Sequence, residues 1–227
     1  MKRIGSTALA LVVLLTAACT KHEDRTTTSN TAAVGTAGRA DTSVSSGDRD
    51  FIQDVVKANT AEIELARTAS DKSTSPDVKQ FAQMMVTDHT AAGDKLNAIA
   101  SDNAIAVDAQ LDETRRDVRD KLTRKQGLDF DRDYMDTMVD EHQKLVDKLE
   151  SRIDRDTLSK WKTEASNHDT GQKARVEGKA QMVVPEKSDD LVTQRLNAWA
   201  ADTYPTAYAH LESAKALRDA VKKRSTN

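Results

Sequence analysis

Two five-residue blocks of the sequence share the pattern Met-Val-x-acid-His. They span residues 85–89 and 138–142, so their histidines, His89 and His142, lie 53 residues apart. Histidine side chains bind transition metals through either ring nitrogen, and a repeated histidine on two helices is one way to bring two imidazoles together. We therefore ask which other ligands the chain offers and which elements position them.

Glu62 and His210 fall on the apolar side of two other helical stretches. Together with the two repeated histidines they offer three imidazoles and one carboxylate, a set that suits Zn²⁺, Cu²⁺ or a mononuclear iron. Asp88 and Glu141 directly precede the repeated histidines. On a helix they point about 100° away, so they are either hydrogen-bond partners of the ligands or surface charges.

Four long stretches carry apolar residues at alternating intervals of four and three, which predicts amphipathic helices that share one core. We expect them over about residues 48–72, 76–99, 129–149 and 191–223. Each candidate ligand lies on the inward side of a different helix. Counted from the turn between the first two helices, Glu62 and His89 differ by three residues, or about 4.5 Å of rise, which a Glu side chain spans.

Two further segments are expected to be helical. A charged stretch over residues 109–125 predicts a short surface helix that ends at Gly127, because glycine is common just past a helix end. Residues 155–187 have looser helical spacing and are interpreted as an insertion. The predicted organisation is thus an all-α domain over residues 48–224, with extra short helices.

The N-terminal residues predict export and lipidation. Lys2 and Arg3 precede a short apolar segment, and residues 15–19 (Leu-Thr-Ala-Ala-Cys) resemble a bacterial lipobox. That resemblance implies a signal peptide over residues 1–18, lipidation of Cys19 and a cell-envelope protein held by its lipid in the membrane. Thr20 after the cysteine favours the outer membrane, facing the periplasm. Residues 19–47 are rich in small polar residues, which predicts a disordered tether. An ordinary secretory signal is the alternative.

Composition excludes several classes of function. The 37 acidic residues outnumber the 34 basic ones, so no basic surplus supports nucleic-acid binding. The single cysteine excludes an internal disulfide framework. The sequence contains no Gly-x-Ser-x-Gly motif and no glycine pattern for nucleotides. We therefore expect a binding protein rather than an enzyme.

Several segments resemble one family of bacterial envelope proteins, called domain of unknown function 4142. The resemblance rests on residues 50–51, 76–89, 130–135, Pro205 and residues 210–211, and it covers roughly residues 48–217. It implies a ferritin-like antiparallel four-helix bundle without an established activity. The chain departs from the family pattern at residues 57–61, where a glycine-rich turn is usual, and in the insertion.

A di-iron centre is disfavoured, because ferritin-like di-iron sites need Glu-x-x-His on two helices. The positions three residues before the candidate histidines hold Val86, Val139 and Ala207, which are not ligands. Two interpretations remain. In the first, the histidines and Glu62 bind one metal ion. In the second, the histidines are hydrogen-bonded core residues, and the domain is a metal-free interaction or stress-tolerance module that recruits a protein partner in the envelope.

Overall fold

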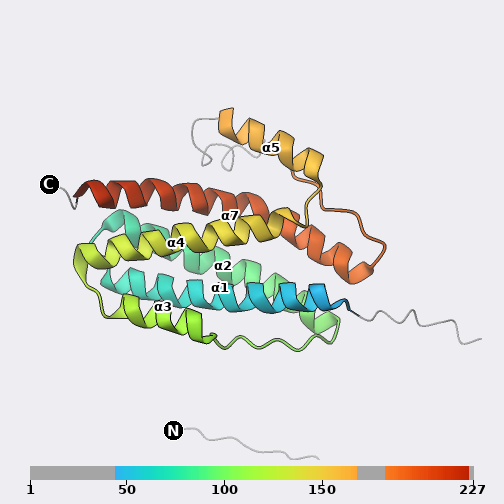
Figure 1. Cartoon of the computed structure of the whole chain (residues 1–227), viewed down its shortest axis with the longest axis horizontal. Coiled ribbons are helices and arrows are strands. Elements are labelled where there is room, and N and C mark those ends of the chain that lie inside the picture. Colours follow the sequence, from blue (N-terminus) through green and yellow to red (C-terminus); the bar gives the residue numbers. More distant parts are fainter. Residues whose placement is uncertain (1–43, 168–181, 225–227) are drawn as a thin grey trace, which may run out of the picture. The chain divides into compact units, whose positions relative to one another are not determined.

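The computed structural model describes residues 44–167 and 182–224, and its regular elements are helices (Figure 1). The prediction of an all-α chain is confirmed. The helices are α1 (Ser46–Lys72), α2 (Pro76–Asp102), α3 (Glu113–Thr123), α4 (Gly127–Glu150), α5 (Arg155–Asn167) and α7 (Leu191–Arg224). The predicted signal peptide, Cys19, most of the predicted tether and residues 168–181 lie outside the described residues.

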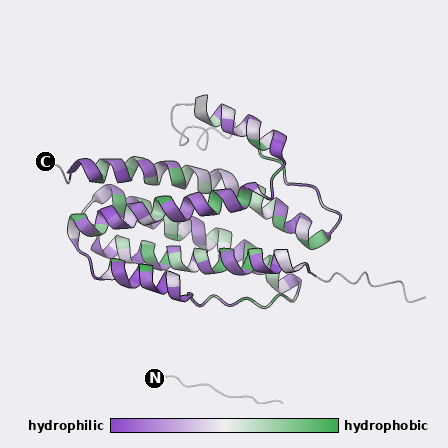
Figure 2. Ribbon diagram, in the orientation of Figure 1, coloured by the Kyte–Doolittle hydropathy of each residue, from purple (hydrophilic) through white to green (hydrophobic). Residues whose placement is uncertain are grey.

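The four long helices pack side by side. α1 contacts α2 along its length and α4 contacts α7, while α2 also contacts α7 and α1 also contacts α4. Each long helix thus has two long neighbours, and α3 lies against α1 and α4. Hydrophobic and hydrophilic residues alternate along each helix (Figure 2). Most of the residues predicted to face inward are buried, among them Phe51, Val55, Leu65, Met85, Leu96, Met135, Met138, Leu149, Leu196, Trp199 and Ala214.

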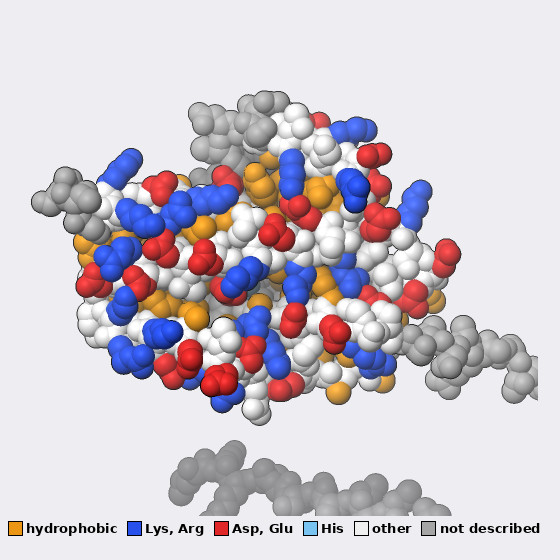
Figure 3. Space-filling view, in the orientation of Figure 1, with side chains coloured by type: hydrophobic (Ala, Val, Ile, Leu, Met, Phe, Trp, Pro, Cys, Tyr) orange, Lys and Arg blue, Asp and Glu red, His pale blue; other side chains and the backbone are white. Residues whose placement is uncertain are grey.

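The outer surface is charged. On the face drawn in Figure 3, acidic and basic side chains are interspersed rather than separated into patches. Within residues 44–167 and 182–224, no helix combines the length and the apolar character needed to cross a membrane.

α1 begins two residues before the predicted start because a serine caps it. The Asp48 backbone N–H donates to Ser45 Oγ at 3.0 Å, and that hydroxyl donates to Asp48 Oδ2 at 2.9 Å. Such a side-chain cap satisfies backbone donors that the first helical turn leaves free. Val44, just before the cap, is also buried. Residues 44–47, which were predicted to lie in the tether, therefore belong to the helical domain.

The turn between α1 and α2 has the predicted residues, with Ser75 at the N-cap and Pro76 at the first helical position. The Ser75 hydroxyl makes no capping bond and instead accepts from Arg224 Nη1 at 3.0 Å. The prediction for Gly127 was wrong. α3 already ends at Thr123, and Gly127 has φ +55° at the start of α4, a left-handed conformation that glycine adopts without steric cost.

The prediction for residues 155–187 holds in part. Residues 155–167 form α5, but the described residues 182–187 are extended rather than helical. They lie beside the end of α4, where Ile153 and Pro185 form an isolated antiparallel bridge and the Asp154 N–H donates to Val184 O at 2.8 Å. The proline interrupts any helix here, because it lacks the N–H that a helix requires.

An ion pair between the half-buried Arg152, in the turn after α4, and the buried Asp48 joins that turn to the beginning of α1 and α7. Arg152 Nη2 donates to Asp48 Oδ1 at 2.8 Å, and the guanidinium lies 3.9 Å from the centre of the Phe51 ring. Thr193 Oγ1, on α7, donates to the other carboxylate oxygen at 2.7 Å. Burial raises the pKa of Asp48, but the hydrogen bonds from Thr193, Arg152 and Ser45 outweigh it and hold that pKa below its ordinary value.

Candidate metal centre

Three histidine rings meet between the long helices. The ring centroids lie 5.4 Å apart for His89 and His142, 5.6 Å for His89 and His210, and 5.5 Å for His142 and His210. One ring nitrogen from each residue lies within 4.8 Å of one from each of the others. All three side chains are buried, and so is Glu62. The structure thus brings together His89, His142 and His210 from α2, α4 and α7, whereas Glu62 of α1 lies beside His89 and His142 and is not part of that group of three.

Fixed acceptors hold the outer nitrogen of two of the rings. His142 Nδ1 donates to the Met138 backbone oxygen at 2.9 Å, and His210 Nε2 donates to Asp88 Oδ2 at 2.9 Å. A carbonyl oxygen or a carboxylate oxygen only accepts, so the proton lies on these ring nitrogens. In the neutral rings, the lone pairs are therefore on His142 Nε2 and His210 Nδ1. The latter is buried and has no hydrogen-bond partner.

The third ring is oriented by an amide. His89 Nδ1 lies 3.0 Å from Asn59 Oδ1, which accepts its proton, so the lone pair of the neutral ring is on Nε2. His89 Nε2 lies 3.4 Å from His142 Nε2. With the outer nitrogens protonated, two lone pairs face each other across this distance. A tetrahedral ion with bonds of 2.0–2.1 Å places its ligand atoms about 3.3–3.4 Å apart, so this pair matches one edge of such a site.

Glu62 supplies a carboxyl group without a hydrogen bond. Its Oε2 lies 3.0 Å from His89 Nδ1 and 4.0 Å from His142 Nε2, yet neither carboxyl oxygen has a hydrogen-bond partner. The short approach to His89 is a contact and not a hydrogen bond, because that N–H points at Asn59. Glu62 of α1 and His89 of α2 are therefore in contact, as expected from their similar predicted heights along the two helices.

Burial keeps these groups neutral in the absence of a cation. It raises the pKa of Glu62 to about 8, with a smaller contribution from the negative charge of Glu141. Burial, and then the neighbouring imidazoles, lower the pKa of His89 well below its ordinary value and that of His142 to about 3. Both imidazoles are thus neutral at pH 7, which is the form that binds metal ions.

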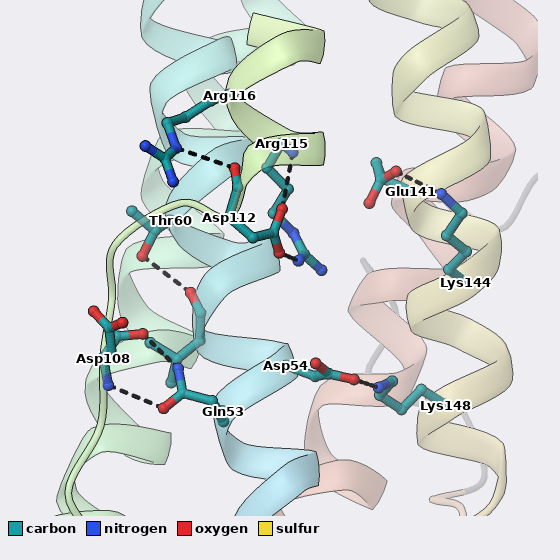
Figure 4. A network of polar contacts seen from close by, with 11 residues as sticks. Gln53, Asp54, Thr60, Asp108, Asp112, Arg115, Arg116, Glu141, Lys144 and Lys148 are labelled. Atoms are coloured by element: carbon teal, nitrogen blue, oxygen red, sulfur yellow. Dashed lines mark hydrogen bonds and ion pairs between the residues drawn. The ribbon is translucent and has the colours of Figure 1, made fainter.

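The two acids that precede the repeated histidines have different surroundings. Asp88 hydrogen-bonds His210 on α7 rather than the ring of its own neighbour. Glu141 forms an ion pair with Lys144 at 2.8 Å on the outer side of α4, as Figure 4 shows. Asp88 therefore holds a candidate ligand in place, whereas Glu141 is a surface charge.

Sequence reasoning missed Asn59 and the carbonyl group of Met138. Asn59 lies three residues before Glu62, so both side chains share one face of α1. That spacing was a usable signal. Asn59 also fits closely against α2, because a Cβ atom added to Gly93 would lie 2.6 Å from its Nδ2. Because Gly93 has no side chain, the Asn59 amide fits against α2, where it orients His89.

Comparison with protein families gives a match over residues 33–177 to a model described as a domain of unknown function (DUF4142). The match includes Glu62, His89 and His142, and it ends before His210. No curated protein and no solved structure matches the chain.

Proposed function

The chain belongs to the family described as domain of unknown function (DUF4142), and because that membership assigns no activity, we propose a function from the buried centre. The protein binds one divalent transition-metal ion through His89, His142, His210 and Glu62. One observation carries the proposal. Each imidazole is anchored through one ring nitrogen, one nitrogen of each ring lies within 4.8 Å of one from each of the others, and a buried carboxyl group without a hydrogen bond lies beside His89 and His142.

A bound cation would offset several unfavourable free-energy contributions of the buried histidines and Glu62. A buried polar atom without a partner costs about 1–3 kcal/mol, and the centre contains such atoms in His210 and in Glu62. In addition, the lone pairs of His89 and His142 face each other at 3.4 Å. One ion among these atoms would provide the missing partner for each of them.

The donor set also limits which ion fits. Three nitrogens and one oxygen suit Zn²⁺, Cu²⁺ or a mononuclear iron. A di-iron centre would need further carboxylates to bridge two ions, and Val86 and Val139 stand where such helices carry a glutamate. Asp88 supports the single-ion proposal, since a carboxylate that accepts from the second nitrogen of a ligating histidine fixes the ring and raises its basicity.

We further propose a ferritin-like four-helix bundle as the setting of this site. The mutual contacts of α1, α2, α4 and α7 support it, as does the resemblance carried by residues 76–89 and 130–135. We also propose that the protein is lipid-anchored at Cys19 in the cell envelope. That part rests on the pattern of residues 1–19 in the sequence alone.

Metal content tests the proposed function. The full-length protein, purified without a polyhistidine tag, is expected to contain close to one equivalent of Zn²⁺, Cu²⁺ or iron. Added metal should raise its melting temperature, because an ion that binds only the native state at a hundredfold excess over Kd stabilises it by about 2.7 kcal/mol. His89→Ala and His142→Ala should abolish this stabilisation.

His22→Ala serves as the control, because it removes a histidine of the predicted tether. It should leave the metal content and the metal-dependent stabilisation unchanged. If the triple variant of His89, His142 and His210 takes up as much metal as the unaltered protein, the proposed function is wrong. A metal-free interaction module would then be the better description.

A further inference from the structure

A cavity of about 90 Å³ lies against the candidate metal centre. Glu62, His89 and His210 contribute to its wall, whereas His142 does not. The cavity thus touches the face of the centre that lies opposite His142. Exposed residues, Asn97 and Ala109, also line it, so it connects the buried centre with the surface of the molecule.

Small residues create this space. Ala58 on α1, Ala92 and Gly93 on α2, and Ala207 on α7 all line it. Protein interiors are otherwise packed about as densely as organic crystals, so small residues facing one another from three helices leave room that larger ones would fill. The small residues of the sequence therefore place the cavity beside the candidate metal centre.

Much of the remaining wall is apolar. Val55, Leu96 and Trp199 contribute to it. The indole nitrogen of Trp199 donates to Ala92 O at 3.1 Å, so the polar atom of this side chain already has its partner. Polar groups of the wall include the carboxyl groups of Glu62 and Asp88. These two groups, when ionised, balance the charge of a divalent ion and leave no surplus to attract an anion.

We infer that the cavity admits a small uncharged molecule of two or three heavy atoms to an open coordination position on the bound ion. This inference rests on the proposed function. The size limit on the molecule follows from the cavity volume of about 90 Å³. A water-sized group occupies about 30 Å³ in the liquid. The preference for an uncharged molecule follows from the two carboxyl groups. The preference for an apolar molecule follows from the aliphatic and aromatic wall.

The first experiment uses full-length protein that is loaded with Cu²⁺ and then reduced to Cu⁺, because carbon monoxide, an uncharged diatomic probe, binds the reduced ion. The infrared spectrum should show a saturable band from metal-bound carbon monoxide. Ala207→Leu places a larger side chain in the cavity and replaces no candidate ligand, so it should bind Cu⁺ normally and weaken carbon monoxide binding at least tenfold. Ala216→Leu, at an exposed position of the same helix, should bind both normally.

The second experiment examines the cavity without metal. Xenon should bind saturably to the metal-free protein, as seen in the ¹²⁹Xe chemical shift, and Ala207→Leu should remove this binding. If that variant does not fold, Ala92→Leu tests the same cavity from α2. Xenon binding in a protein that takes up no metal would show that the proposed function has failed while the cavity exists.

Other outcomes overturn the inference itself. A Cu⁺-loaded protein that binds no carbon monoxide has no open position facing the cavity. Equal carbon monoxide affinity in the unaltered protein and in a variant with a filled cavity would mean that the molecule reaches the ion by another route. Saturable binding of azide to the ion in the Cu²⁺-loaded protein would contradict the preference for uncharged ligands, because that preference rests on the charge balance of a divalent ion.

Discussion

The carboxyl group of Glu62 should make metal binding depend on pH in a defined way. Burial raises its pKa to about 8, so at neutral pH the metal-free protein carries a proton there that the ion must displace. The pKa of His89 lies well below its ordinary value and that of His142 is about 3. These two ligands are already deprotonated and contribute no competing proton near neutral pH.

The size of the effect follows from the one proton. Below pH 8 each unit of pH should weaken the apparent affinity tenfold, which is about 1.36 kcal/mol. Between pH 8 and pH 6 the apparent Kd for Zn²⁺ should therefore rise about fiftyfold, because half of the group is already deprotonated at pH 8, and above pH 8 the Glu62 contribution should level off. Metal affinity falls as the pH falls, because the Glu62 carboxyl group binds the ion only in its deprotonated form.

Competition with a chromophoric chelator, from pH 6 to pH 9 in non-coordinating buffers, measures this dependence. Glu62→Gln should remove the tenfold slope and bind more weakly at pH 8, because an amide replaces the anionic ligand. Glu64→Gln is the matched control, since that carboxylate is partly exposed and pairs with Arg119 at 3.5 Å. A slope that is the same with and without Glu62 would refute the argument.

Three further substitutions test neighbouring parts of the structure. Asp88→Asn should weaken metal binding about 10–100-fold in the same competition assay, as is usual when the hydrogen-bond partner of a ligand is altered. Gly93→Ala should lower the melting temperature and the metal affinity together, because the new methyl group displaces the amide that orients a ligand. Arg152→Ala should lower the free energy of unfolding by about 3 kcal/mol in a urea titration, because it leaves a buried carboxylate unpaired.

Each substitution has a control of the same type. Glu141→Gln alters the other acid that precedes a histidine and should change metal affinity much less than Asp88→Asn does, because Glu141 pairs with Lys144 and hydrogen-bonds no candidate ligand. Gly47→Ala should be tolerated, because the nearest atom to the added Cβ is 3.9 Å away. Lys148→Ala breaks an exposed ion pair and should cost about 1 kcal/mol or less. Equal effects of a substitution and its control would contradict the role assigned to the buried residue.

Periodicity predicted the helices and the inward position of the candidate ligands. The reason is physical, since an apolar residue every three or four positions leaves a helix one side to bury. The same argument placed Glu62 and His89 at nearby levels, because a short turn fixes the relative height of two adjacent helices. The positions of Ser75 at the N-cap and Pro76 in the first turn were likewise readable from the sequence, whereas the bond between the Ser75 hydroxyl and Arg224 was not.

The partners across helices were less predictable. Asp88 reaches His210 because α2 and α7 are neighbours, and a spacing within one helix contains no information on which other helix lies beside it. Gly127 was misread because glycine suits both the end of one helix and a left-handed residue at the start of the next. The extended course of residues 182–187 depends on contacts with Ile153, a residue far away in the sequence.

The distribution of the candidate ligands over four helices also affects when an ion can be captured. Glu62 and His89, the nearest pair in the sequence, are separated by 27 positions (89 − 62), and His210 lies on the last helix described. During synthesis, therefore, no short nascent segment presents the full set, and the set is complete only after that helix has docked. Under the proposed function, a chain of this design would acquire its ion where its folding finishes, so the supply of metals in that compartment would decide which ion it holds.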